Sequence, residues 1–183
     1  MRAVLAVAAA LICAALPLSV RAEDPRAISL VDQRGDPFAL SQLHGHPSLV
    51  TFVASRCTDA CPIADGMFLA LEKKLRADHV RATLVTITLD PDYDTPYVMA
   101  GYAHRFDANP AEWRFASGRP ADVRRLMRSF GVLAQKDKNG VADIHTTFVY
   151  VLDSHVRLAK QLLLSSNLTQ EAEQALKDSA VNK

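Results

Sequence analysis

The chain has 183 residues, 49% of them hydrophobic, and carries 21 Lys and Arg residues against 20 Asp and Glu residues. This length suits a single domain with a buried core. The near-zero net charge argues against nucleic-acid binding driven by bulk electrostatics.

The first 22 residues have the features of an export signal. Arg2 supplies a positive start, an apolar stretch follows over residues 3–20, and residues 20–22 (VRA) place small side chains around a cleavage position. The apolar stretch approaches the length of a membrane span, but it is rich in alanine and interrupted by Pro17. We therefore predict an exported protein with a cleaved signal; an uncleaved signal would tether it to a membrane.

The remaining residues, 23–183, are predicted to form one domain in which strands and helices alternate. The first half predicts an N-terminal hairpin over 28–43, a buried strand over 48–55, a helix over 62–77, a strand over 82–89 and a helix that Thr95 caps before Pro96. The second half predicts a short strand over 113–116, a helix over 123–130 stopped by Gly131, strands over 146–152 and 156–163, and a helix over 169–177. This order indicates an α/β fold with a mixed central sheet flanked by helices, and the thioredoxin-like arrangement fits it best, with the hairpin as an extension that decorates the domain.

Two cysteines carry the main chemical signal, because a third, Cys13, lies within the export signal. Cys57 follows the buried strand over 48–55, and Cys61 precedes the helix that we expect to begin at Pro62. At this spacing the two side chains point the same way over one helical turn, and the N–H groups at the helix start favour thiolate over thiol. Joint metal ligation, a reversible disulfide and a structural disulfide in an oxidising compartment all remain open.

Four segments together resemble the Sco/SenC family of copper-binding proteins, which take part in the assembly of cytochrome c oxidase. They are the cysteine segment TFVASRCTDACP, the segment LDPDYDTP over 89–96, the segment WRFASG, and the segment DIHTTFVYVLD, which places His145 84 residues after Cys61. The resemblance covers roughly residues 28–176. It implies that Cys57, Cys61 and His145 bind copper, as Cu(I) or Cu(II), and that residues 23–183 are a copper-binding domain. Thiolate and imidazole ligands suit both oxidation states and leave a position open for transfer to a partner.

His145 is predicted to open the strand that follows it, where its side chain can face the cysteine loop. Thioredoxin-type oxidoreductases place a cis-proline before the corresponding strand, but residues 141–150 contain no proline, which weakens a disulfide-exchange interpretation. Thr58 departs from the family, which generally has proline after the first cysteine. This change frees the loop backbone.

Asp90 and Asp94 are candidates to orient the copper ligands from outside the site, with helix capping and turn formation as the equally weighted alternative. His44 and His46 flank a glycine in an expected surface loop and are weaker candidates for an accessory copper site.

The resemblance implies an exported, periplasmic or otherwise extracytoplasmic metallochaperone. Its partner would be the copper-bearing subunit of cytochrome c oxidase or another copper chaperone. The alternative is an enzyme, a thiol-disulfide reductase that uses Cys57 or Cys61 to keep the cysteines of a copper-accepting protein reduced. A peroxidase-like redoxin is disfavoured, since such enzymes usually have a threonine-proline motif in the segment that leads to the reactive cysteine, and this sequence lacks that motif.

Overall fold

A computed structural model describes residues 24–58, 60–145 and 148–181. The predicted signal, residues 1–22, lies outside the described residues. Seven strands form one mixed sheet in the order β2 (Pro37–Phe38), β1 (Leu30–Asp32), β5 (Trp113–Ser117), β4 (Thr83–Thr88), β3 (Ser48–Val53), β8 (Phe148–Leu152) and β9 (Leu158–Leu163). A separate two-stranded sheet pairs β6 (Ala134–Lys136) with β7 (Ala142–His145). The helices are α1 (Ala60–Ala77), α2 (Pro96–His104), α3 (Pro120–Ser129) and α4 (Leu168–Val181), with short 3-10 turns at Pro25–Ala27 and Leu40–Leu43.

The centre of the sheet is built from the two strands that the sequence predicts as buried runs. Every residue of β3 and of β4 is buried, and the two strands pair in parallel. Strand β5 extends this parallel group, whereas β8 pairs with β3 in the antiparallel direction. Because parallel strands need a crossover, α1 connects β3 to β4 and α2 connects β4 to β5. The mixed α/β prediction is confirmed.

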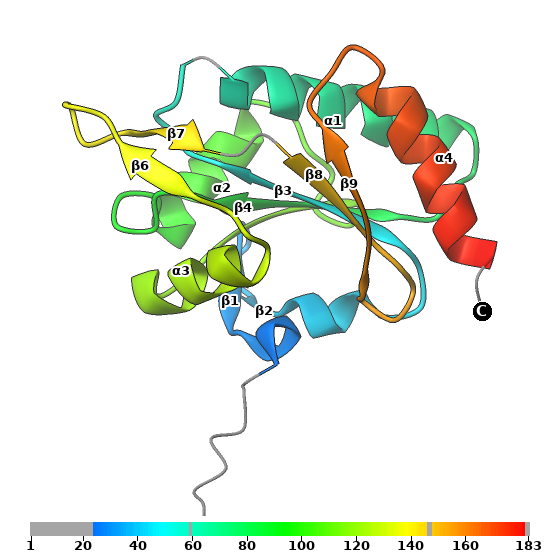
Figure 1. Ribbon diagram of the computed structural model, residues 1–183, viewed down its shortest axis with the longest axis horizontal. Helices are drawn as coiled ribbons and strands as arrows, with labels where there is room; N and C mark the ends of the chain where they lie inside the picture. Colours follow the sequence, from blue (N-terminus) through cyan, green and yellow to red (C-terminus); the bar gives the residue numbers. More distant parts are fainter. Residues whose placement is uncertain (1–23, 59, 146–147, 182–183) are drawn as a thin grey trace, which may run out of the picture.

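Helices cover both faces of the sheet (Figure 1). On one face, Phe68 of α1 and Tyr102 of α2 pack against Trp113 and Phe115 of β5. On the other face, Phe130 at the end of α3 makes edge-to-face contacts with Phe52 of β3 and Tyr150 of β8. Helix α4 packs against α1 and β9. Aromatic contacts therefore anchor α1 and α2 to β5 on one face and the end of α3 to β3 and β8 on the other.

The N-terminal hairpin belongs to the sheet instead of merely decorating it. Strand β1 pairs with β2, as predicted, but it also pairs with β5. Its neighbouring side chains Ile28, Leu30 and Phe38 are almost fully buried. Burial of this much apolar surface makes the hairpin part of the hydrophobic core.

Two element boundaries differ from the sequence prediction, and the start of α2 agrees with it. Helix α1 begins at Ala60, before Pro62, so Cys61 lies inside the helix. Strand β9 begins after Val156, which adopts a left-handed conformation with φ 60° in the turn that Asp153 closes. Thr95 caps α2 as predicted, because its hydroxyl accepts a hydrogen bond from Val98 N–H at 3.3 Å.

Candidate metal centre

The two cysteines lie at the C-terminal end of β3, where the chain turns into α1. Neither forms a disulfide and both are buried, with exposed fractions of 5% for Cys57 and 1% for Cys61. Cys57 N–H donates to the carbonyl of Ala54 at 3.0 Å, which closes a turn directly after the strand. Ala54 N–H in turn donates to Sγ of Cys61 at 3.4 Å. The first turn of α1 therefore folds Cys61 back onto the end of the strand, on the same side as Cys57.

Burial dominates the protonation of Cys61. It raises the pKa of this thiol far above its usual range, and a hydrogen bond with the Cys57 thiol raises it further. The N–H group of Ala54 opposes this effect, while the carboxyl group of Asp65 adds to it. The expectation that the helix start favours a thiolate is therefore wrong for Cys61 in the metal-free protein, because desolvation outweighs the N–H groups.

Asp94 holds the backbone that leads into the cysteine loop. Its carboxylate is fully buried and accepts hydrogen bonds from Ser55 N–H at 3.1 Å, from the Ser55 hydroxyl, and from the Thr88 hydroxyl at 2.8 Å. The carbonyl of Asp94 accepts a hydrogen bond from the hydroxyl of Ser117 at the end of β5. Asp94 thus connects the C-terminal ends of β3, β4 and β5. Its contact at β3 is Ser55, which lies two residues before Cys57.

Asp90 performs a related task through charge. Its Oδ2 accepts a hydrogen bond from the guanidinium of Arg56 at 2.8 Å, and its Oδ1 lies 2.9 Å from Nζ of Lys136 in β6. Asp90 is 1% exposed, so both ion pairs have a buried end. In addition, the backbone carbonyl of Asp90 accepts from Tyr93 N–H and Asp94 N–H, which forms the turn before α2. Both acids therefore contact the residues that precede Cys57, and the turn formation that the sequence suggests is present; their orientation of copper ligands stays a prediction.

His145 ends a strand and does not open one. It is the last residue of β7, and its backbone pairs with Ala134 in β6. The predicted strand over 146–152 is described only from Phe148, where β8 begins, and residues 146–147 lie outside the described residues. The side chain of His145 also lies outside the described part, so the structure places its backbone at the end of the β6–β7 hairpin and leaves ligation by its imidazole a prediction.

A buried carboxyl group lies one helical turn beyond Cys61. Asp65 is fully buried, and burial raises its pKa to about 7. Its carboxyl oxygens accept hydrogen bonds from the Tyr102 hydroxyl at 2.8 Å and from the Thr86 hydroxyl at 3.3 Å. Thr86 accepts a hydrogen bond from the indole N–H of Trp113 at 2.9 Å. This chain of polar contacts links the cysteine helix to β4 and β5 inside the core.

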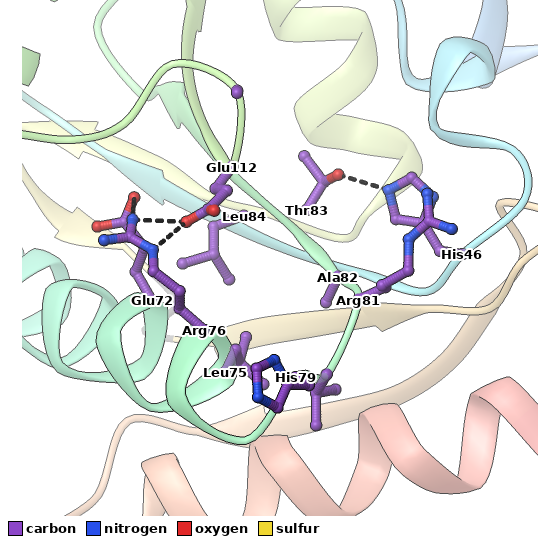
Figure 2. A pocket seen from close by; sticks show the side chains of 12 residues that line it. His46, Glu72, Leu75, Arg76, His79, Arg81, Ala82, Thr83, Leu84 and Glu112 are labelled. Carbon is purple, nitrogen blue, oxygen red and sulfur yellow. Dashed lines mark hydrogen bonds and ion pairs between the residues drawn. The ribbon is translucent and has the colours of Figure 1, made fainter.

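The other histidine candidates lie away from the cysteines. His46 precedes β3, at the opposite end of the strand from Cys57, and its imidazole Nε2 lies 2.8 Å from the hydroxyl of Thr83. Figure 2 shows His46 and Arg81 on one side of a cavity of about 510 Å³, with Arg76 bound to Glu112 on the other. His46 therefore lies outside the cysteine site, and His44 is exposed.

Among the side chains that the structure describes, no group of three or more His, Cys, Asp or Glu residues is arranged to hold a metal ion. The three-ligand copper site of Cys57, Cys61 and His145 therefore stays a prediction. No helix within the described residues is long and apolar enough to cross a bilayer.

Three polar residues near the cysteines are not predicted from the sequence. Arg56 and Lys136 bind Asp90, and Asp65 is buried within the cysteine helix α1. Opposite charges directly after two adjacent strands, at Arg56 and Asp90, are a usable signal, since such strand ends meet at one edge of a parallel sheet. Lys136 carries no comparable signal, because the partner it reaches is remote in sequence.

A parallel β3–β4–β5 group with helical crossovers, and a cysteine pair where β3 enters α1, define a thioredoxin-like protein. The chain belongs to the SCO1/SenC family, because the family model described as SCO1/SenC matches residues 23–180.

Individual relatives agree with this assignment. An SCO2-like protein of Rickettsia typhi is 27% identical over 144 residues, which cover 75% of this chain and 69% of the relative. The structure of Bradyrhizobium japonicum ScoI with copper bound is 27% identical, with a TM-score of 0.73 over 83% of this chain and 96% of that chain. A SCO1/SenC family lipoprotein of Bacillus anthracis has a TM-score of 0.76 at 24% identity, over 83% of this chain and 92% of that chain, and supports the fold alone. The SCO1/SenC family takes part in the copper-related assembly of cytochrome c oxidase.

Proposed function

We propose that this protein is an exported metallochaperone that binds one copper ion through Cys57, Cys61 and His145. The observation that carries the proposal is the pair of buried thiols at the end of β3, joined through Arg56 to the hairpin that ends at His145. Two soft sulfur ligands favour Cu(I), and an added imidazole also accommodates Cu(II). The copper-bound structure of the Bradyrhizobium japonicum relative supports this choice of metal.

Copper is the cargo of this site, and the protein supplies its binding and release. Burial keeps the Cys61 thiol protonated in the metal-free state, so copper must displace its proton when the thiolate forms. Three protein ligands leave a position through which an acceptor can attack the metal. The acceptor that we propose is the copper-bearing subunit of cytochrome c oxidase, or another copper chaperone, in the periplasm or another extracytoplasmic space.

Titration of the reduced, purified protein with Cu(I) tests the proposal directly. We expect one copper per chain, and we expect Cys57→Ser and Cys61→Ser each to weaken binding by at least about tenfold, because each removes a soft ligand. A wild-type protein that binds no stoichiometric copper would refute it. Incubation of the loaded protein with the copper-bearing domain of the oxidase subunit then tests delivery.

A thiol-disulfide reductase is the second candidate, and the hydrogen bond between the Cys57 and Cys61 thiols supports it, because it brings together the two sulfur atoms that would form the disulfide. In this reaction the thiolate of Cys57 attacks a disulfide of the acceptor, and one acceptor cysteine leaves as a thiolate. The thiolate of Cys61 then attacks Cys57, which releases the second acceptor cysteine and leaves a Cys57–Cys61 disulfide. The acceptor is reduced by two electrons and this protein is oxidised by two.

The two candidates make opposite predictions for metal-free protein. A reductase converts an oxidised acceptor to its dithiol without copper, and Cys61→Ser traps the mixed disulfide. A chaperone leaves the oxidised acceptor unchanged and transfers copper only to the reduced form.

A further inference from the structure

We propose that Arg56 is the positioning residue of the copper site, because its guanidinium ties the β6–β7 hairpin, and with it the backbone of His145, to the cysteine loop. The expected effect of Arg56 on copper affinity rests on the proposed copper function. The attachment of the hairpin to the cysteine loop through Arg56 is present without metal.

The position of Arg56 gives it direct influence on the cysteine loop. It directly precedes Cys57, and its backbone follows Ser55, which Asp94 holds in place. Its side chain is 31% exposed and leaves the loop toward the region between β4 and the hairpin. The guanidinium also lies 4.0 Å from the centre of the Tyr93 ring, a cation–π contact that favours one orientation of its plane.

One terminal nitrogen of Arg56 joins two elements that are remote in sequence. The atom Nη2 donates to Oδ2 of Asp90 at 2.8 Å and to the carbonyl of Gly140 at 2.8 Å. The carboxylate of Asp90 reaches the same hairpin a second time, through its ion pair with Lys136 at 2.9 Å. The loop before Cys57, the loop after β4 and the hairpin are therefore connected through one guanidinium and one buried carboxylate.

The hairpin offers Arg56 a firm point of attachment. Asp137 holds the turn by accepting hydrogen bonds from Asn139 N–H and Val141 N–H, each at 2.8 Å, and Gly140 adopts a φ of 74° that other residues rarely tolerate. The carbonyl of Gly140 is thus presented by a turn with its own internal support. Because β6 and β7 form a sheet separate from the main one, strand pairing in the seven-stranded sheet does not hold them.

Arginine suits this task better than lysine. A planar guanidinium can stack on Tyr93 and at the same time direct its N–H groups at two acceptors, whereas an ammonium group lacks the fixed plane. Loss of the side chain would leave Asp90 buried with Lys136 as its one ion-pair partner among the described side chains. We therefore infer that the hairpin loosens without Arg56 and that the His145 backbone loses its fixed place relative to Cys57.

Hydrogen exchange of the full-length, metal-free protein tests the attachment, and a Cu(I) competition titration tests its consequence. In Arg56→Ala we expect the amides of residues 134–145 to exchange about tenfold faster, the scale of one lost charge-assisted hydrogen bond, while β3 and β4 keep their protection. Copper affinity should fall about tenfold for the same reason. Arg56→Lys should recover part of both effects.

The matched control is Arg76→Ala, which removes an arginine that pairs with Glu112 and Glu72 at the other end of the sheet. It should change neither hairpin exchange nor copper affinity. If Arg56→Ala lowers global stability, Arg56→Lys provides the comparison in a folded protein. Unchanged exchange over 134–145 in the folded variants would overturn the proposal, as would faster exchange with wild-type copper affinity. If the wild type binds no copper, the copper function fails while the exchange data still decide the attachment.

Discussion

Arg56 and Asp90 meet at 2.8 Å, although one follows β3 and the other follows β4. The contact places an ion pair with a buried carboxylate directly beside Cys57. Together with the Asp94 carboxylate, which binds Ser55, it fixes both residues that precede the first cysteine. Asp94 therefore contacts the backbone and hydroxyl of Ser55, and Asp90 contacts the guanidinium of Arg56, in the two residues before Cys57.

Asp94→Ala should strongly destabilise the fold. The substitution leaves the Ser55 N–H and hydroxyl and the Thr88 hydroxyl without their buried acceptor, and we expect a loss of about 3 kcal/mol or more in the free energy of unfolding. Urea denaturation measures it. The control is Asp92→Ala, which removes a half-exposed carboxylate paired with Arg124 and should cost about 1 kcal/mol or less. Equal losses in the two variants would contradict the role of Asp94.

The Asp65 carboxyl group should make stability depend on pH. Burial raises its pKa to about 7 in the folded protein, whereas an unfolded chain has an Asp pKa of about 3.9. The folded state therefore holds this proton more tightly, so its contribution is fully present below about pH 4 and is lost as the pH rises to about 7, at about 1.4 kcal/mol per unit of pKa difference.

Asp65→Asn keeps an oxygen that accepts the Tyr102 hydrogen bond but removes the titration. We expect its free energy of unfolding, measured in urea between pH 5 and 8, to fall less steeply with pH than that of the wild type. Parallel curves for the two proteins would show that this carboxyl group does not titrate in that range.

Cys61 should react slowly in the metal-free, folded protein. Burial raises the pKa of its thiol, so little thiolate is present at pH 8. We expect alkylation of Cys61 by iodoacetamide, followed by peptide mass spectrometry, to be at least about tenfold slower than in the urea-unfolded chain, because each unit of pKa is a factor of ten in thiolate. Equal rates in the folded and unfolded chains would contradict the burial of this thiol.

The sequence predicts the parts of the fold that rest on strong local signals. The strands β3 and β4 are recognisable because their apolar, β-branched runs are covered on both faces, and α2 because Thr95 and Pro96 mark its start. The hairpin of β6 and β7 is not predicted, since Ala134–Lys136 has no apolar pattern and depends on the Asp137 turn and on ion pairs to Asp90. Such long-range contacts leave no periodicity in the sequence.

In the candidate site, too, features with a local sequence signal are predicted and features that depend on distant contacts are not. The strand before Cys57 and the helix start near Cys61 predict that both cysteines lie where β3 enters α1, and the structure confirms this, with Cys61 inside the first turn of α1. The protonation of Cys61 depends on burial by distant segments, which spacing does not report. The role of His145 rests on family resemblance, and the structure adds the placement of its backbone at the end of β7.

Copper binding by His145→Ala is the most direct test of the three-ligand site. Reduced wild-type and variant proteins are titrated with Cu(I) against a chromophoric chelator, and their Cu(II) forms are compared by the thiolate-to-copper absorption band. The control is His155→Ala, which changes an exposed histidine in the turn before β9. We expect His145→Ala to lose at least about tenfold in affinity and to show an altered band, because a ligand is removed, while the control matches the wild type. Wild-type affinity together with an unchanged band in His145→Ala would contradict the account.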